Sequence, residues 1–259
     1  MDARRRLNRR NVPELDDIVY GIHAVTEALG GGEPLRRIHV ADERRRDPAL
    51  RALLAAAAQA GVAVRFESRG FFAQFPYKAH QSVVAYTTPF AYVTLEEALE
   101  RRRAVEPALF VVLDHVTDPH NLGAIVRTAE AVGADALVLP ERRSAGVNAT
   151  VRKAAAGATA YVPIARVANV AQSVRRLKGA GLWVAGADTS PRAEQYDRAN
   201  LRVDLALVIG AEGGGISPVV RKECDLLLRI PMAGKVASLN ASVAAAVLLF
   251  EVRRQREMS

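Results

Sequence analysis

From Ala108 onward, short apolar runs alternate with segments of helical spacing, and this rhythm constrains the fold more than any other feature of the chain. The runs that are short enough to be buried strands cover residues 109–113, 136–139, 161–164, 182–185, 205–209 and 226–230. We expect helices at residues 122–132, 147–157, 169–181 and 241–254, with a short one after Ser217. Such alternation predicts an α/β fold in which helices cover both faces of a mostly parallel sheet.

The loop between the last two runs carries the clearest sign of a binding site. Residues 210–215 read Gly-Ala-Glu-Gly-Gly-Gly, so Glu212 is the only ionisable group of a loop that has almost no side chains. Glycine lacks a Cβ, and a glycine-rich loop therefore lets its backbone approach a ligand closely. A glycine cluster alone more often makes ordinary turns. Here a second strand, Pro231 and a helix cap at Ser238 or Asn240 follow, and this layout predicts a small-molecule pocket.

Other loops are expected to meet the glycine loop. In open parallel sheets, ligands bind beyond the carboxyl ends of the strands. Residues 114–123 and 186–188 also follow predicted strands directly. We therefore expect these loops to converge with residues 210–215 at one edge of the sheet.

The helix predicted after residue 121 offers a cation to that edge. Pro119 and Asn121 mark its start, with Asn121 as the expected N-cap. Gly123 and Arg127 share a helix face, and helical side chains lean toward the N-terminus. We therefore expect Arg127 to lie over the bare surface of Gly123, with its guanidinium toward Asn121. A cation there can bind a phosphate or stabilise a developing oxyanion. The alternative is an ordinary ion pair with Glu130.

A metal site is a weaker reading of the same loop. Asp114, His115, Asp118 and His120 lie close together in the sequence, but no other cluster of His or Cys supports a metal, and a polar loop is preferred. We expect that no metal is required. The glycine loop superficially resembles a phosphate-binding P-loop, yet Ile216 stands where that motif needs lysine. Neither a dinucleotide-binding G-x-G-x-x-G after a strand nor a G-x-S-x-G elbow occurs.

The charge of the chain favours a polyanionic partner. Its formal net charge is +8, of which residues 1–10 supply +4 through five arginines and one aspartate. Basic charge attracts nucleic acid without regard to sequence, and solubility is the simpler alternative. Basic and polar residues follow the strand predicted at 136–139, where they would help to bind a polyanion, and a solvated basic loop is the alternative. They are Arg142, Arg143, Asn148, Arg152 and Lys153.

The chain is expected to contain two domains. Residues 1–17 read as a basic, disordered tail, 18–89 as a small α/β unit, 90–106 as a linker with a helix at 95–106, and 107–259 as the sheet domain. No apolar run is long enough to cross a membrane, and no secretory signal is recognised. Cys224 is the only cysteine, which excludes an intramolecular disulfide. We expect a cytoplasmic protein.

Three segments together resemble the motifs of a known family. Residues 118–130 read Asp-Pro-His-Asn-Leu-Gly-Ala-Ile-Val-Arg-Thr-Ala-Glu, 209–213 read Ile-Gly-Ala-Glu-Gly, and 230–232 with 238–240 read Ile-Pro-Met and Ser-Leu-Asn. In this order they are similar to the three motifs of the SpoU/TrmH family, the RNA ribose 2'-O-methyltransferases of the SPOUT superfamily. The likeness covers about residues 107–257.

The front of the chain resembles the same family. Residues 20–25 and 80–85 are similar to the start and end of its small substrate-binding domain. With residues 143–145 and 148–150, the chain most resembles the type that methylates a guanosine ribose in 23S rRNA. Two departures are Gly214, where an acid is common, and Ser82, where glycine is common. Neither removes a proposed catalytic group.

The resemblance implies a deep trefoil knot in the C-terminal domain that holds S-adenosyl-L-methionine, an L30e-like N-terminal domain, and a homodimer. The apolar helix expected from Ala241 suits burial at such an interface or within one subunit. By likeness, the cofactor would contact Gly210, Ile230, Met232 and Leu239. The positions that match the family's active site are Asn121, Arg127, Glu212, Ser238 and Asn240.

The expected substrate is 23S rRNA, free or in an assembling large subunit. A tRNA or another rRNA site is the alternative within methylation. The rival from another class is a non-catalytic RNA-binding factor in ribosome assembly. Loss of Arg127 or Glu212 would have favoured that rival, and both are present. Charged guanidinium has no acceptor, so we expect Arg127 to bind phosphate rather than to act as the base.

Overall fold

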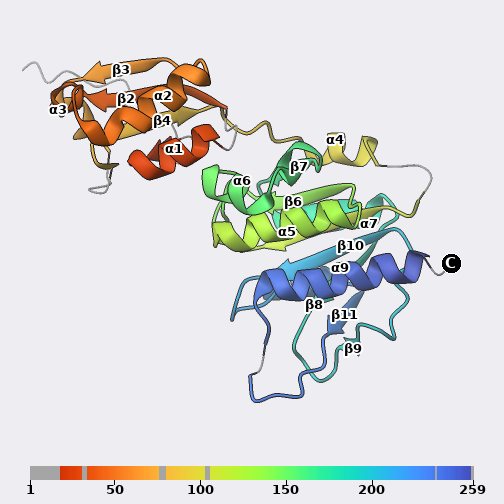
Figure 1. The fold of residues 1–259 in the computed structure, drawn as a ribbon. Helices are drawn as coiled ribbons and strands as arrows, with labels where there is room; N and C mark the ends of the chain where they lie inside the picture. The colour runs from red at the N-terminus through yellow and green to blue at the C-terminus, as the bar shows by residue number, and fades with distance from the viewer. Residues whose placement is uncertain (1–17, 31–33, 76–79, 103–105, 237, 258–259) are drawn as a thin grey trace, which may run out of the picture. The chain divides into compact units, whose positions relative to one another are not determined.

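The computed structural model describes residues 18–30, 34–75, 80–102, 106–236 and 238–257, and the tail expected at 1–17 lies outside them. The chain divides into two compact units, residues 1–90 and 91–259 (Figure 1). None of the helices in the described ranges is both long and apolar enough to cross a bilayer.

The first unit is built on a four-stranded mixed sheet with the order β1-β4-β2-β3. Strand β4 runs antiparallel to both β1 and β2, whereas β3 is parallel to β2 and is reached through α2. The elements are β1 (Ile18–Tyr20), α1 (Ile22–Gly30), β2 (Leu35–Ala41), α2 (Arg51–Gln59), β3 (Val64–Glu67), α3 (Arg69–Phe72) and β4 (Val83–Thr87). Apolar side chains at helical or strand spacing, among them Val25, Ile38 and Leu53, are fully buried and form its core.

The segment after Phe90 belongs to the second unit. A capping box of Thr94 and Glu97 starts α4 (Leu95–Glu100), and the helix ends well before residue 106, where we had expected its end. Leu95 and Ala98 are buried in the core of the second unit. Val93 pairs with β7, donating to Ile164 O at 3.0 Å and accepting from Arg166 N at 3.3 Å.

The second unit contains a seven-stranded sheet with the order β7-β6-β5-β10-β8-β11-β9, and every neighbouring pair is parallel. Its strands are β5 (Leu109–Asp114), β6 (Ala136–Pro140), β7 (Ile164–Val167), β8 (Trp183–Ala187), β9 (Glu194–Gln195), β10 (Leu205–Gly210) and β11 (Leu226–Arg229). Its remaining helices are α5 (Pro119–Ala131), α6 (Ala149–Ala155), α7 (Val170–Gly179), α8 (Pro218–Glu223) and α9 (Ala241–Glu257). The predicted parallel α/β fold is therefore confirmed.

Helices cover both faces of this sheet (Figure 1). Successive side chains of a strand point to opposite faces. Phe110 and Val112 of β5 pack in one cluster with residues of α4, α7 and α8. Val111 and Leu113 of the same strand are fully buried on the other face, where α5 packs against α6 and α9.

Two details of the sheet differ from the prediction. The third run was expected at residues 161–164, but β7 is Ile164–Val167. Residues 158–160 form a 3₁₀ turn, and Ala158 O accepts from the backbone N–H groups of Tyr161 and Val162 at 3.1 and 3.2 Å, which keeps those two residues out of the strand. The edge strand β9 was missed, since a two-residue strand leaves no apolar pattern in the sequence.

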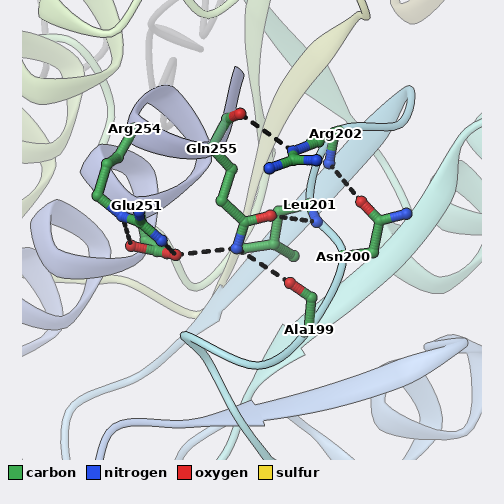
Figure 2. A network of polar contacts seen from close by, with 7 residues as sticks. All are labelled: Ala199, Asn200, Leu201, Arg202, Glu251, Arg254 and Gln255. Carbon is green, nitrogen blue, oxygen red and sulfur yellow. Dashed lines mark hydrogen bonds and ion pairs between the residues drawn. The ribbon is translucent and has the colours of Figure 1, made fainter. Parts of the chain in front are cut away.

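A buried polar network fixes the end of α9 (Figure 2). The Gln255 side chain accepts from Leu201 N at 2.9 Å and donates to Ala199 O at 3.0 Å and to Glu251 Oε1 at 2.8 Å. Arg254 donates to both oxygens of Glu251, and its guanidinium holds the pKa of that carboxyl below the ordinary value. The irregular backbone near Leu201 thus finds its partners in the helix, as buried backbone groups must.

Candidate functional site

The loop after β10 turns back on itself through its glycines. Ala211 and Gly215 exchange backbone hydrogen bonds of 3.0 and 2.8 Å. A Cβ on Gly210 would lie only 2.1 Å from the carbonyl carbon of Gly215. Gly213 and Gly215 have φ angles of +74° and +63°, which other residues rarely adopt. The turn therefore requires glycine at these positions, and it leaves Glu212 as the one charged side chain of the loop.

A buried carboxylate anchors the far end of this loop. Asp114, the last residue of β5, lies beside Gly210 of β10 and is only 1% exposed. Its Oδ2 accepts from Ser217 N at 2.7 Å, and its Oδ1 lies 2.7 Å from His115 Nδ1. Because a buried carboxylate needs such partners, Asp114 ties the glycine loop to the β5–α5 loop.

Asn121 does not cap α5 as we had predicted. Asp118 is the N-cap and accepts from His120 N at 2.9 Å, since the residue before Pro119 favours an extended conformation. Asn121 instead lies in the first helical turn and is 6% exposed. Its Nδ2 lies 3.4 Å from Glu212 Oε2, a long hydrogen bond. Two predicted site residues from distant segments are thus brought together.

Arg127 is exposed on α5, and its guanidinium forms neither the ion pair with Glu130 nor a hydrogen bond to any other residue in the described ranges. Our expectation that it covers Gly123 is wrong. A Cβ on Gly123 would lie 2.4 Å from Ala154 Cβ and 2.7 Å from Val151 O, so α6 fills that space. Gly123 therefore permits close packing of two helices, and the guanidinium of Arg127 faces solvent.

A cavity of about 510 Å³ opens where β8, β10 and β11 end. All four residues predicted to contact a cofactor line it, namely Gly210, Ile230, Met232 and Leu239. Glu212 and Ser238, predicted as active-site residues, also line it. The loops after β8 and β10 therefore share one cavity, as the sequence predicted, and the contact of Asn121 with Glu212 brings the β5–α5 loop to it.

Asn240 has a different place. Its Oδ1 accepts from Ser242 N at 2.9 Å and from Val243 N at 3.4 Å, so it caps α9. The start of α9 lines the cavity through Ala241 and Ala244. Asn240 therefore orients the wall of the cavity through the helix.

Two oppositely charged residues that line the same cavity, Asp188 and Arg221, were not predicted from the sequence. Asp188 follows β8, and Arg221 lies on α8. The position of Asp188 directly after a predicted strand could have identified it, because residues 186–188 were expected at this edge. Nothing in the sequence indicated Arg221, which is brought there by tertiary packing.

The predicted RNA-binding residues lie on two sides of the β6–α6 connection. Arg142 and Arg143 are exposed in the loop after β6. Ala145 N and Ser144 Oγ donate to Val116 O at 3.0 and 3.1 Å, which joins this loop to the β5–α5 loop. Asn148 caps α6 by accepting from Val151 N at 3.1 Å, and the last turn of that helix carries Arg152, half-buried, and Lys153, exposed.

The two carboxylates of the candidate metal site have other partners. Asp114 accepts from Ser217 N, and Asp118 caps α5. Across the described ranges, no group of three or more His, Cys, Asp or Glu side chains is arranged to hold an ion.

Most of the chain is similar to known RNA methyltransferases. Residues 108–250 match the SpoU rRNA methylase family, and residues 18–93 match the family described as RNA 2'-O ribose methyltransferase substrate binding. An uncharacterised tRNA/rRNA methyltransferase of Synechocystis is 41% identical over 96% of this chain, which spans 65% of that protein. The putative TrmH family tRNA/rRNA methyltransferase YacO of Bacillus subtilis is 41% identical, over 93% of this chain and 96% of the relative. The 23S rRNA (guanosine-2'-O-)-methyltransferase RlmB of Pseudomonas putida is 43% identical, over 93% of this chain and 97% of the relative.

Solved structures of methyltransferases have a similar fold. The SpoU methyltransferase AviRb of Streptomyces viridochromogenes, crystallised with AdoMet, superposes with a TM-score of 0.60 at 27% identity, covering 93% of this chain and 90% of its own. An AdoMet-bound rRNA methyltransferase of Sinorhizobium meliloti has a TM-score of 0.59 at 26% identity, and the match covers 92% of this chain and 86% of the Sinorhizobium chain. From its two matched domains and its parallel sheet, the chain belongs to the SpoU family of RNA methyltransferases.

Proposed function

We propose that this protein transfers the methyl group of S-adenosyl-L-methionine to the 2'-hydroxyl of a guanosine ribose in 23S rRNA. The observation that carries the proposal is the cavity beside the contact of Asn121 with Glu212. It supplies a binding site for a small molecule next to polar groups that can orient a ribose. The name of the Pseudomonas relative supports 23S rRNA and guanosine, whereas other relatives are described only as tRNA/rRNA methyltransferases.

The cavity suits S-adenosyl-L-methionine. Its volume of about 510 Å³ falls in the usual range of ligand pockets, roughly 300–1,000 Å³. Apolar Leu239 and Met232 can cover an aromatic base, and the glycine loop offers backbone groups. The carboxylate of Glu212 favours a ligand that carries a positive sulfonium. When bound, this cofactor supplies an electrophilic methyl group, and the proposal needs no metal.

Arg127 is proposed to act on the RNA. Its exposed guanidinium is free to bind the phosphate next to the target ribose and to stabilise negative charge on the 2'-oxygen. A charged guanidinium has no acceptor, so the 2'-hydroxyl proton is proposed to leave through phosphate or water. Asn121 and Glu212 would orient the ribose, with Ser238 at the mouth of the cavity. If Arg127→Lys were inactive although RNA and cofactor affinities stayed normal, this role would be wrong.

The RNA is proposed to lie along the edge at which these loops meet. Arg142 and Arg143 are exposed there, and the loop that carries them is bonded to the β5–α5 loop. Phosphate contacts of this kind supply affinity without sequence specificity. The substrate-binding domain at residues 18–93 is proposed to supply the choice of RNA.

A homodimer is also proposed. Val243 and Phe250 of α9 are 48% and 54% exposed and lie seven residues, about two turns, apart on the helix, so both apolar side chains face solvent on the same side of α9. Beside Phe250, the ends of α5 and α9 form a hollow of about 490 Å³. A second copy would cover this apolar surface. Sedimentation velocity should give a dimer for the parent protein and a monomer for Phe250→Glu, and a monomeric parent would contradict the proposal.

The function is tested by transfer of tritiated methyl groups to 23S rRNA transcripts and to tRNA, with mapping of alkali-resistant sites. We expect label at one guanosine ribose of 23S rRNA and none with Arg127→Ala. Label in tRNA would keep the chemistry and overturn the substrate. If neither RNA nor precursor ribosomal particles were labelled although the cofactor bound, a non-catalytic RNA-binding factor would be the better description.

A further inference from the structure

An ion pair lies in the wall of the cavity, and the roles given to Arg127, Asn121 and Glu212 do not involve it. Arg221 Nε is 2.8 Å from Asp188 Oδ2. Asp188 Oδ1 in turn accepts from Ser190 N at 2.6 Å. The carboxylate is 14% exposed and the guanidinium 43% exposed, so the pair stands at the boundary between the wall and solvent. Asp188 thus pairs with one edge of the guanidinium.

The other edge of that guanidinium is available. Arginine carries five N–H donors in a planar fork. The contact with Asp188 is made through Nε, and for the terminal nitrogens of Arg221 we find no partner in the part of the chain that the structure describes. Of the described residues that line the cavity, Arg221 is the one cation. A ligand anion that enters the cavity would therefore meet a single guanidinium, paired with Asp188 on one edge only.

The charges of the cavity match one end of the cofactor. S-adenosyl-L-methionine and its product, S-adenosyl-L-homocysteine, both end in an amino acid with a carboxylate and an ammonium group. A carboxylate that leaves water needs a charged or multiple hydrogen-bond partner, and a guanidinium fork fits it best. Glu212 and Asp188 line the same cavity and repel an anion, so they cannot bind it.

We propose that Arg221 binds the carboxylate of the cofactor's amino-acid end and so selects ligands that carry this group. This inference rests on the cofactor named in the proposed function. It is tested by isothermal titration with ligands that lose the amino acid in steps. S-adenosyl-L-homocysteine has both charges, its decarboxylated analogue keeps the ammonium group, and 5'-methylthioadenosine has neither.

The variant Arg221→Met removes the charge and keeps an unbranched side chain. We expect it to weaken S-adenosyl-L-homocysteine about 10- to 100-fold, the usual effect of a lost charged hydrogen bond. Its affinity for the other two ligands should stay within about twofold of the parent value. Lys222→Met is the matched control, because Lys222 is exposed on the same helix and does not line the cavity. It should change none of the affinities.

Equal weakening of all three ligands would overturn the inference, because Arg221 would then shape the cavity or contact the adenosine. No change for S-adenosyl-L-homocysteine would overturn it too. Thermal unfolding of each variant is measured alongside, and Arg221→Gln, with the same expectations, replaces the methionine variant if that does not fold. A parent protein that binds none of the ligands would refute the cofactor in the proposed function instead.

Discussion

Replacing Gly210 with alanine should disable the cavity, and its neighbour Gly214 offers a control in the same loop. The new Cβ would lie 2.1 Å from the carbonyl carbon of Gly215 and 2.3 Å from its oxygen, whereas ordinary contact begins at 3.4 Å. The turn must therefore withdraw by about 1.3 Å, and its backbone has no flexible end that can move aside. At Gly214 the nearest atom is 3.9 Å away, so a methyl group fits.

Overpacking of this kind costs roughly 1–3 kcal/mol, and a backbone clash belongs at the upper end of that range. We expect Gly210→Ala to lose about 3 kcal/mol in its free energy of unfolding. Because the same loop lines the cavity, S-adenosyl-L-homocysteine should bind at least about tenfold more weakly. Gly214→Ala should change either quantity by less than about 1 kcal/mol. The measurements are urea unfolding and isothermal titration. Parent-like stability and affinity in Gly210→Ala would refute this account of the loop.

Other parts of the structure give three further predictions. Gln255→Leu should lower the free energy of unfolding by about 2–4 kcal/mol, because it leaves Ala199 O and Leu201 N buried without their partner; urea unfolding measures this, and a loss below about 0.5 kcal/mol would contradict it. Burial raises the pKa of Cys224 to about 12. An aromatic disulfide reagent at pH 8 should therefore modify the thiol of the native protein at least about 100-fold more slowly than that of the unfolded protein. Equal rates would contradict this prediction. Burial lowers the pKa of His39 below its ordinary 6.5, so the unfolded state binds more protons and the free energy of unfolding should fall as the pH drops below about 6.5. Melting curves from pH 8 to 5 test this. The variant His39→Phe, which keeps a ring stacked on Phe71, should lose this part of the pH dependence, and an unchanged pH dependence would contradict the prediction.

The central sheet was predictable because its strands carry their own signal. Residues 109–113 and 205–209 are apolar throughout, and the structure pairs them as β5 and β10, buried on both faces. Parallel strands place their carboxyl ends at one edge, so the meeting of the loops near Glu212 followed from the order of the elements. The four cofactor positions came from a resemblance, and the structure places all four on one cavity; their contact with a cofactor stays a prediction.

The remaining details depend on contacts that local patterns do not record. Asp and Asn are both good N-caps, so residue type does not decide between Asp118 and Asn121. The extended backbone of the residue before Pro119 makes Asp118 the cap of α5. Glycine is needed at position 123 because α6, about 30 residues further along the chain, packs against it, and Arg127 plays no part in this. The partnership of Asp188 with Arg221 exists only once α8 has packed beside β8. The trefoil knot, the L30e-like domain and the cytoplasmic location stay predictions.

The two ends of the large sheet bear on how copies of this protein can associate. An unpaired border strand is a template for another chain, and proteins limit this risk by keeping such strands short or covered. At one border stands β9, which has only two residues. At the other, β7 is already bonded by Val93 from the preceding segment. Extension of the seven-stranded sheet from one molecule to the next is therefore disfavoured at both of its borders, which favours helix surfaces as the route by which copies of the second unit assemble.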